Sequence, residues 1–189
     1  MKLVLIVGSV TPPGRLSGAV RWLRDTAQAT YQSAAELIDL ADKRLSFADG
    51  RPPASFQDDT AAVVASVHAA DAVIIATPVY RGSITGALKN LLDHLPVEAL
   101  ASKPVGIIAM GATPHHFLGA DWHLRDILAW FGALVMPTSV YLTSADFVEG
   151  RLVDSARQDL TALLDAAVKL TALAAPGNFL GPPPFAARR

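Results

Sequence analysis

Five short apolar runs recur along this chain, and most of them are apolar at every position rather than at every second one. A strand of this kind must be covered on both faces, as in a parallel sheet with helices on either side. Segments with helical periodicity separate the runs, and this alternation predicts a doubly wound, five-stranded parallel α/β sheet. The expected strands are residues 3–7, 35–40, 73–76, 105–110 and 134–142.

Five amphipathic helices are expected, each marked by a stripe of apolar residues at helical spacing. Ser17 is placed to cap the first helix, and Asp58 and Asp59 are placed to open the second. Residues 1–175 are predicted to form one domain, followed by a Pro- and Gly-rich tail over residues 176–189. The stripes begin at Val20, Val63, Leu88, Phe117 and Val153.

Charge and composition exclude several classes of protein. Sixteen Lys and Arg residues oppose seventeen Asp and Glu, so the chain lacks the basic excess of a generic nucleic-acid binder. The absence of cysteine from the sequence excludes disulfides, thiolate nucleophiles and cysteine-bound zinc. The uncharged stretch 127–145 contains Gly132 and Pro137, so we interpret it as a helix end, a turn and a buried strand, not a membrane span. We expect a soluble, cytoplasmic protein.

The loop over residues 8–17 is the first of three candidate ligand loops at the carboxyl ends of strands, where doubly wound sheets bind ligands. It combines hydroxyl groups, an arginine and the N-terminus of a helix, which together suit a phosphate. Its spacing fits neither the P-loop nor the dinucleotide fingerprint, so we favour the phosphate of a mononucleotide. The alternative is a Pro-rich turn with a capping serine.

The other two candidate loops cover residues 77–90 and 110–116. In the second loop Gly82 and Gly86 would allow a flat ligand to approach the backbone, whereas an ordinary loop would bury Tyr80 as packing. The third loop contains two of three nearby histidines, His115, His116 and His123. Adjacent histidines do not easily face one ion and no carboxylate completes the set, so we expect no metal.

The second loop closely resembles the signature of the NAD(P)H-dependent FMN reductases, and the other two fall where that family has its remaining flavin loops. The similarity covers nearly the whole chain and is closest to reductases that supply reduced flavin to sulfonate- and sulfone-oxidising monooxygenases. It implies a flavodoxin-like fold of strand order 2-1-3-4-5. The matching residues are Ala76-Thr77-Pro78-Val79-Tyr80 and Gly86-Ala87-Leu88-Lys89-Asn90-Leu91-Leu92-Asp93.

The resemblance assigns FMN-binding roles to residues of all three loops. The first group would hold the phosphate, the second would line the isoalloxazine ring and ribityl chain, and the third would face the ring from the other side. One position departs from the sulfonate-type enzymes, which commonly carry a tyrosine where Ile84 stands. The three groups are Ser9, Arg15 and Ser17; Pro78, Val79, Tyr80, Arg81, Gly82 and Ser83; and Gly111, Ala112 and Thr113.

The implied activity is hydride transfer from NAD(P)H to FMN, which needs no catalytic side chain because the cofactors carry the chemistry. Backbone N–H groups of residues 111–113 are expected to stabilise negative charge on the flavin. A flavin-dependent monooxygenase is the implied acceptor of reduced FMN. The alternatives are an FMN-containing reductase of quinones, azo dyes or metal oxyanions, and a non-enzymatic flavodoxin-like electron carrier.

Assembly is expected as well, because the helix patterns offer more apolar surface than one sheet face needs. The resemblance implies a homodimer or homotetramer that places the flavin near a subunit interface. The residues expected at that interface are Leu88, Leu92, Trp122 and Trp130.

Overall fold

The structure, a computed structural model, describes residues 1–174 apart from the side chains of residues 116–118. The strand order of its main sheet is β2-β1-β3-β4-β5, and every pair along that path is parallel. The predicted doubly wound sheet of order 2-1-3-4-5 is confirmed, whereas the predicted tail lies outside the described residues. The first four strands are β1 (Lys2–Val7), β2 (Ala34–Asp39), β3 (Ala72–Pro78) and β4 (Pro104–Met110).

The fifth strand position is divided between β5 (Leu134–Val135) and β6 (Val140–Leu142), where the sequence predicts one continuous strand. β5 pairs with the start of β4 and β6 pairs with its end. Pro137 interrupts the ladder because proline has no backbone N–H to donate. Arg125 stabilises the interruption, since its guanidinium donates to the carbonyl oxygens of Met136 and Pro137 at 2.9 and 3.2 Å.

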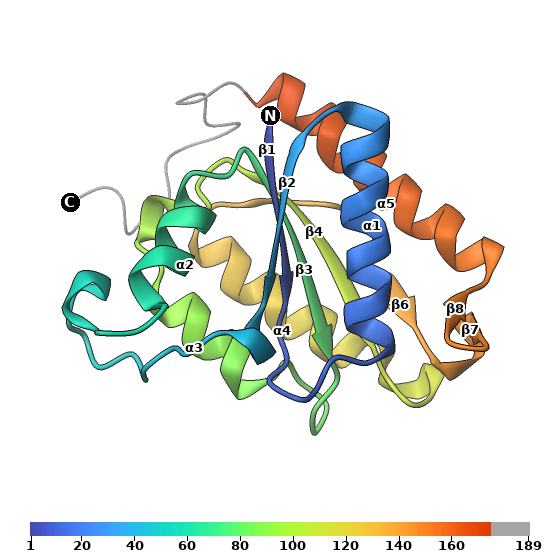
Figure 1. The fold of residues 1–189 in the computed structure, drawn as a ribbon, viewed down its shortest axis with the longest axis horizontal. Coiled ribbons are helices and arrows are strands. Elements are labelled where there is room, and N and C mark those ends of the chain that lie inside the picture. Colours follow the sequence, from blue (N-terminus) through green and yellow to red (C-terminus); the bar gives the residue numbers. More distant parts are fainter. Residues whose placement is uncertain (175–189) are drawn as a thin grey trace.

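Helices cover both faces of the sheet (Figure 1). α1 (Arg15–Tyr31) and α5 (Asp154–Leu173) pack on one face, and α2 (Thr60–His68), α3 (Gly86–His94) and α4 (Phe117–Trp130) pack on the other. Strand residues alternate between the two cores, so that Leu3, Leu5 and Val7 face α1 and α5 whereas Val4 and Ile6 face the other helices. This division explains why the strands are apolar on both faces.

The remaining elements are short. The long connection after β2 contains η1 (Leu40–Asp42) and η2 (Pro53–Ser55), and a hairpin of β7 (Phe147–Val148) and β8 (Arg151–Leu152) precedes α5. Three further 3-10 turns are η3 (Val97–Ala99), η4 (Pro114–His116) and η5 (Ser144–Asp146). Across residues 1–174 the structure contains no helix that is long and apolar enough to span a membrane.

Hydrogen bonds hold the connection after β2 against the body of the protein. The Asp58 carboxylate accepts from the Ser46 N–H and hydroxyl at 2.8 and 2.7 Å and from the Thr60 N–H at 2.9 Å. These donors hold the pKa of Asp58 well below its usual range. Asn90 of α3 adds two bonds, accepting from the Ala48 N–H and donating to the Ser46 carbonyl.

Candidate functional site

The three candidate loops all leave the sheet at its carboxyl edge, at the bottom of Figure 1. The first loop begins at Gly8, whose N–H donates to the Ala76 carbonyl at 2.7 Å. A Cβ on Gly8 would lie 2.9 Å from the Leu88 Cβ, so only glycine lets the loop pass this close to α3. Thr85 joins the first two loops, because its buried hydroxyl donates to the Gly8 carbonyl at 2.5 Å.

The first loop leads into α1, which begins at Arg15 and not after Ser17. The prediction that Ser17 caps this helix is wrong. Gly14 is the N-cap residue, and Ser17 lies inside the first turn, where its hydroxyl is buried. The N–H groups of the first turn have no acceptor within the helix, so they can bind an anion there.

A cavity of about 170 Å³ lies between the first loop, the start of α1 and the ends of the neighbouring strands. Four of the residues predicted from the sequence line it: Ser9, Arg15, Ser17 and Pro78. Two of its hydroxyl groups lie together, since the Ser9 and Thr11 oxygens are 2.7 Å apart and the Thr11 N–H donates to the Ser9 hydroxyl at 3.3 Å. The full lining is Val7, Ser9, Thr11, Pro12, Pro13, Gly14, Arg15, Leu16, Ser17, Asp39, Pro78 and Met110.

Asp39 is a member of this lining that the sequence analysis misses. It ends β2 beside Val7 of β1, and its side chain is 4% exposed. The Ser17 hydroxyl donates to Asp39 Oδ2 at 2.6 Å, the Ala41 N–H donates to Oδ1 at 3.2 Å, and Arg21 Nη2 lies 3.7 Å from Oδ2. The signal that could have found it is the acidic residue at the end of a strand adjacent to β1.

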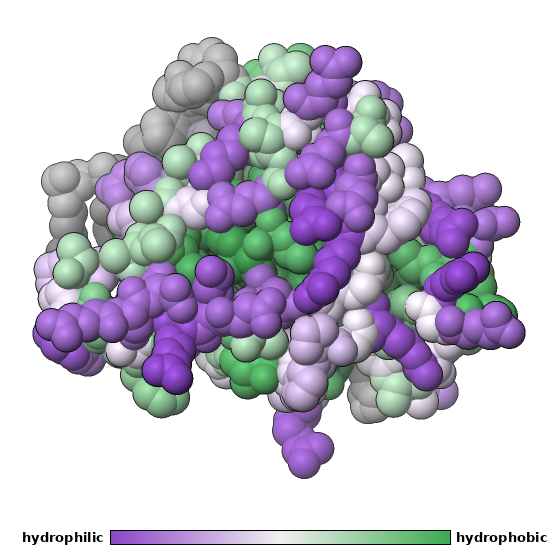
Figure 2. All heavy atoms as spheres, in the orientation of Figure 1, coloured by the Kyte–Doolittle hydropathy of each residue, from purple (hydrophilic) through white to green (hydrophobic). Residues whose placement is uncertain are grey.

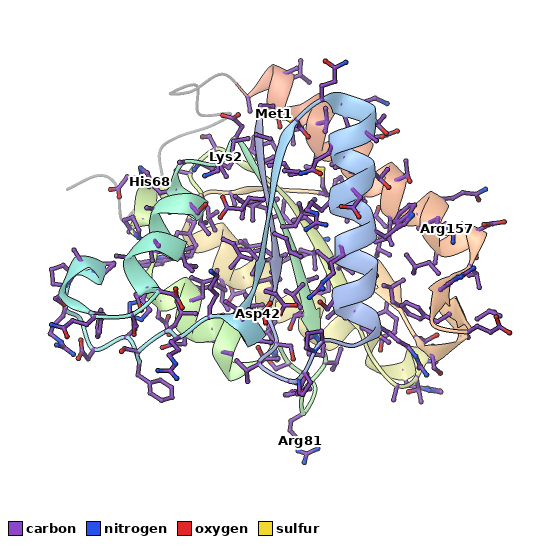
Figure 3. All side chains as sticks on the ribbon, in the orientation of Figure 1. Met1, Lys2, Asp42, His68, Arg81 and Arg157 are labelled. Carbon is purple, nitrogen blue, oxygen red and sulfur yellow. The ribbon has the colours of Figure 1, made fainter. Side chains whose placement is uncertain are left out.

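The second loop projects from the edge as a tight hairpin turn over residues 80–83 (Figures 1 and 3). Tyr80 and Ser83 exchange both backbone hydrogen bonds, at 2.8 and 3.0 Å. Arg81 and Gly82 have φ angles of 52° and 75°, so both central residues are left-handed as in a type I′ turn. Tyr80 is 46% exposed, so it is not the buried packing residue of an ordinary loop.

The tip of this hairpin is hydrophilic and points away from the protein, with Arg81 at its end (Figures 2 and 3). Its base adjoins a second hollow of about 320 Å³, lined by Val79, Tyr80 and Arg81. Pro78 lines the first cavity and Val79 the second, so consecutive residues of the second loop border the two hollows.

One face of α4 supports the hairpin. A Cβ on Gly119 would lie only 2.4 Å from the Gly82 carbonyl oxygen, so the helix and the turn are in direct backbone contact. One helical turn further on, His123 Nδ1 lies 2.8 Å from the Ser83 hydroxyl. His123 therefore holds the second loop, a role that its sequence context does not reveal.

The third loop is held by β6. The Gly111 N–H donates to the Leu142 carbonyl at 3.0 Å, and the Tyr141 hydroxyl donates to the Thr113 carbonyl at 2.8 Å. The expectation that all N–H groups of residues 111–113 face a flavin is therefore wrong for Gly111, whose N–H extends the sheet. A Cβ on Gly111 would lie 2.0 Å from the Tyr141 hydroxyl, so a side chain there would displace this support. Burial raises the pKa of Tyr141.

Of the third loop, Met110 reaches the first cavity, and its carbonyl accepts from the Val79 N–H at 2.8 Å. Gly111, Ala112 and Thr113, all described, fall outside the lining of both hollows. The structure thus brings the first two loops and Asp39 together around the first cavity. The third loop follows β4, the next strand along the sheet, and contributes only Met110 to this cavity. Among the described residues, no group of three or more His, Asp or Glu side chains could hold a metal ion. The His116 side chain lies outside that description.

A parallel sheet of this strand order, with ligand loops at its carboxyl edge, defines a flavodoxin-like α/β protein. Residues 1–147 match the family described as NADPH-dependent FMN reductase. The chain belongs to that family. The predicted recognition as an FMN reductase is confirmed, together with the predicted oxidoreductase class and the use of FMN and NAD(P)H.

Individual relatives agree with the family assignment. An NAD(P)H-dependent FAD/FMN reductase of Geobacillus thermodenitrificans is 43% identical over 120 residues, which cover 63% of this chain and 65% of that protein. An FMN-dependent NADPH-azoreductase of Staphylococcus aureus is 33% identical over 155 residues, 79% of this chain and 80% of that one. The apo structure of the NADH:FMN oxidoreductase EMOB matches with a TM-score of 0.76 at 25% identity, covering 93% of this chain and 90% of the other.

The contact between Gly119 and Gly82 predicts the effect of a methyl group in α4. Gly119→Ala should push the hairpin away from the helix and lower the free energy of unfolding, although alanine favours helix by about 1 kcal/mol over glycine. The loosened tip should also be cut faster by trypsin after Arg81. Gly18→Ala is the matched control, because it lies in the first turn of α1 and its methyl group would enter open space. That control should be neutral or stabilising, and equal behaviour of the two variants would contradict the contact.

Proposed function

We propose that this FMN reductase holds the FMN phosphate in the cavity at the N-terminus of α1. The observation that carries the proposal is the combination of donors there. Residues of the first turn of α1, the hydroxyl-bearing Ser9 and Thr11, and Arg15 all line one cavity of about 170 Å³. Such donors suit a phosphate dianion, and the cavity matches a phosphate group better than a whole flavin. Ser17 contributes its backbone N–H, because its hydroxyl donates to Asp39.

The isoalloxazine ring and ribityl chain are assigned to the second hollow and the hairpin. Pro78 lines the phosphate cavity, Val79, Tyr80 and Arg81 line the second hollow, and Gly82 and Ser83 complete the turn. Gly111, Ala112 and Thr113 are assigned to the other side of the ring. Since the Gly111 N–H bonds to Leu142, we assign the stabilisation of flavin negative charge to the N–H groups of Ala112 and Thr113.

When bound, FMN supplies the hydride-accepting chemistry, so the protein needs to orient two rings and needs no acid or base. The backbone of the hairpin suits this task, because both of its central residues have fixed left-handed conformations. Tyr80 keeps nearly half of its surface exposed and leaves the approach to the hairpin open. An open approach favours a flavin that enters and leaves, and therefore the supply of reduced FMN to a cytoplasmic monooxygenase.

The second candidate function is the reduction of azo dyes or quinones by retained FMN. Ile84 favours it, since this residue matches the general FMN reductases and not the sulfonate-type enzymes. Ile84 is buried in the core, and α3 begins regularly at Gly86 with Thr85 as its N-cap residue. A relative from Staphylococcus aureus at 33% identity is named an FMN-dependent NADPH-azoreductase, which supports the azo-dye part of this candidate.

We also propose that the protein is a homo-oligomer joined through α3 and α4. Leu88, expected at the interface, is fully buried in the core of the chain itself, so that part of the expectation is wrong, whereas Leu92 is largely buried but borders the groove described below. Trp122 and Trp130 remain 72% and 61% exposed. Trp130 borders a groove of about 520 Å³ between the two helices, and exposed apolar surface of this kind is typical of an interface. The groove is lined by Lys89, Leu92, Asp93, Leu95, Asp126, Ile127, Ala129, Trp130 and Phe131.

Removal of the Arg15 guanidinium should weaken the binding of FMN but not of riboflavin. Arg15→Ala removes a charge-assisted hydrogen bond of about 1.5–3 kcal/mol, so FMN affinity should fall about ten- to a hundred-fold. Arg24→Ala is the matched control, since Arg24 lies on the same helix and pairs with Asp25. Fluorescence titration of both flavins into each variant gives the dissociation constants. Equal losses for FMN and riboflavin would remove Arg15 from the phosphate site.

Flavin supply and retained flavin differ in how the rate depends on added FMN. Release at about 1 s⁻¹ with an on-rate of about 10⁶ M⁻¹s⁻¹ corresponds to a dissociation constant of about 1 μM. The dialysed protein should therefore carry little flavin absorbance, and its NAD(P)H oxidation should saturate near micromolar FMN. Stoichiometric flavin after dialysis, with no stimulation by added FMN, would favour the azo- or quinone-reductase function instead.

Light scattering tests the proposed interface. The native chain should give a particle larger than its 19.9 kDa monomer, and Trp130→Glu should shift it toward the monomer because a charge would be buried. Phe47→Glu is the control, since Phe47 is similarly apolar and exposed but lies outside the groove. A native particle of 19.9 kDa at micromolar concentration would exclude the interface.

A further inference from the structure

The cavity assigned to the FMN phosphate contains a carboxylate, which is an unexpected group in an anion site. Asp39 lines the cavity together with Arg15 and Ser17, and its side chain is almost completely buried. Register places it there, because Asp39 pairs with Val7 at the end of β1, immediately before the first loop. A negative charge in this position opposes the binding of another anion.

Two hydrogen-bond donors and one cation contact the Asp39 carboxylate. The Ser17 hydroxyl and the Ala41 N–H donate to its two oxygens, at 2.6 and 3.2 Å. Arg21 Nη2 lies 3.7 Å from Oδ2, but the Arg21 side chain is 46% exposed, so water screens much of its charge. Arg21 is therefore a weak counter-charge for Asp39.

The hydrogen bond between Ser17 and Asp39 further disfavours the binding of an anion in this cavity. A serine hydroxyl has one proton, and in Ser17 this proton is donated to Asp39. The hydroxyl can then offer a phosphate oxygen nothing but lone pairs. A phosphate oxygen about 2.8 Å from Ser17 Oγ would lie at most about 5.4 Å from Asp39 Oδ2, where like charges repel appreciably in a site that partly excludes water.

We propose that Asp39 limits the affinity of this site for FMN, by repelling the phosphate and by retaining the Ser17 proton. The inference rests on the proposed function, in which reduced FMN must leave the protein. The first-turn N–H groups and Arg15 attract the phosphate, and Asp39 offsets part of that attraction. At a given on-rate, weaker affinity means faster release, so Asp39 is a determinant of flavin exchange.

Asp39→Asn tests this directly, because asparagine has nearly the same shape. Its Oδ1 can still accept from the Ala41 N–H, and its NH₂ group can donate to the Ser17 hydroxyl, which frees the serine proton for the phosphate. The dissociation constant of FMN should fall about tenfold, with a slower dissociation rate in stopped-flow, whereas that of riboflavin should stay within about twofold. Asp42→Asn is the matched control, since it removes the same charge three residues on, at an exposed position outside the cavity.

A double-mutant cycle with Ser17→Ala gives a second readout. In the native background Ser17→Ala should change FMN affinity by less than about threefold, because the hydroxyl proton is already held by Asp39. In the Asp39→Asn background the same change should remove most of the gain. Additive effects of the two substitutions would contradict the proposal.

Three other outcomes would overturn the inference: unchanged FMN affinity in Asp39→Asn, equal tightening for FMN and riboflavin, or the same tightening in Asp42→Asn. Weaker binding of both flavins with a lower free energy of unfolding would likewise reduce Asp39 to a structural anchor. All of these titrations are made without nicotinamide. Failure of the native protein to oxidise NAD(P)H in the presence of FMN would therefore reject the proposed function separately from the role of Asp39.

Discussion

Burial of the central strands on both faces is the constraint on which the rest of the structure depends. β1 and β3 lie in the middle of the sheet, and their side chains alternate between two separate cores. Parallel neighbours cannot be joined by hairpins, so the chain must return through helices that cover the two faces. Every strand then ends at the same edge. The hydrogen bonds from the Gly8, Val79 and Gly111 N–H groups continue the ladder beyond the strands and fix the start of each loop.

The strands and helices of this fold could be predicted from the sequence, because the spacing of apolar residues differs between the two. Runs that are apolar on both faces, such as residues 3–7, identify strands, and stripes such as that beginning at Leu88 identify helices. The break at Pro137 could have been anticipated from its missing N–H. Its stabilisation by Arg125 could not, because that contact joins α4 to the edge of the sheet through the folded arrangement alone.

The candidate site divides in the same way. Hydroxyls, an arginine and glycines mark the loops, and the first cavity does collect Ser9, Arg15, Ser17 and Pro78. The direction of individual groups is set by neighbours distant in sequence, so it could not be predicted. The Asp39 carboxylate at the end of β2 accepts the Ser17 hydroxyl proton, and the Leu142 carbonyl of β6, which pairs with β4, accepts from the Gly111 N–H. The sequence shows which hydrogen-bond donors the loops contain. Strand order and register decide which of these donors are already hydrogen-bonded within the protein and which remain for a ligand.

Helix α4 contacts two separate parts of the molecule, the groove beside α3 and the hairpin over residues 80–83. Its second half borders the groove beside α3, and its first half touches the hairpin through Gly119 and His123. A helix of 14 residues is a stiff rod of about 21 Å, so a displacement at one end is transmitted to the other. At Gly119 the helix and the hairpin lie too close together to admit even a Cβ. The groove beside α3 and the hairpin that carries Arg81 are therefore mechanically joined through one helix, so a change that moved α4 at the groove would also reach the hairpin.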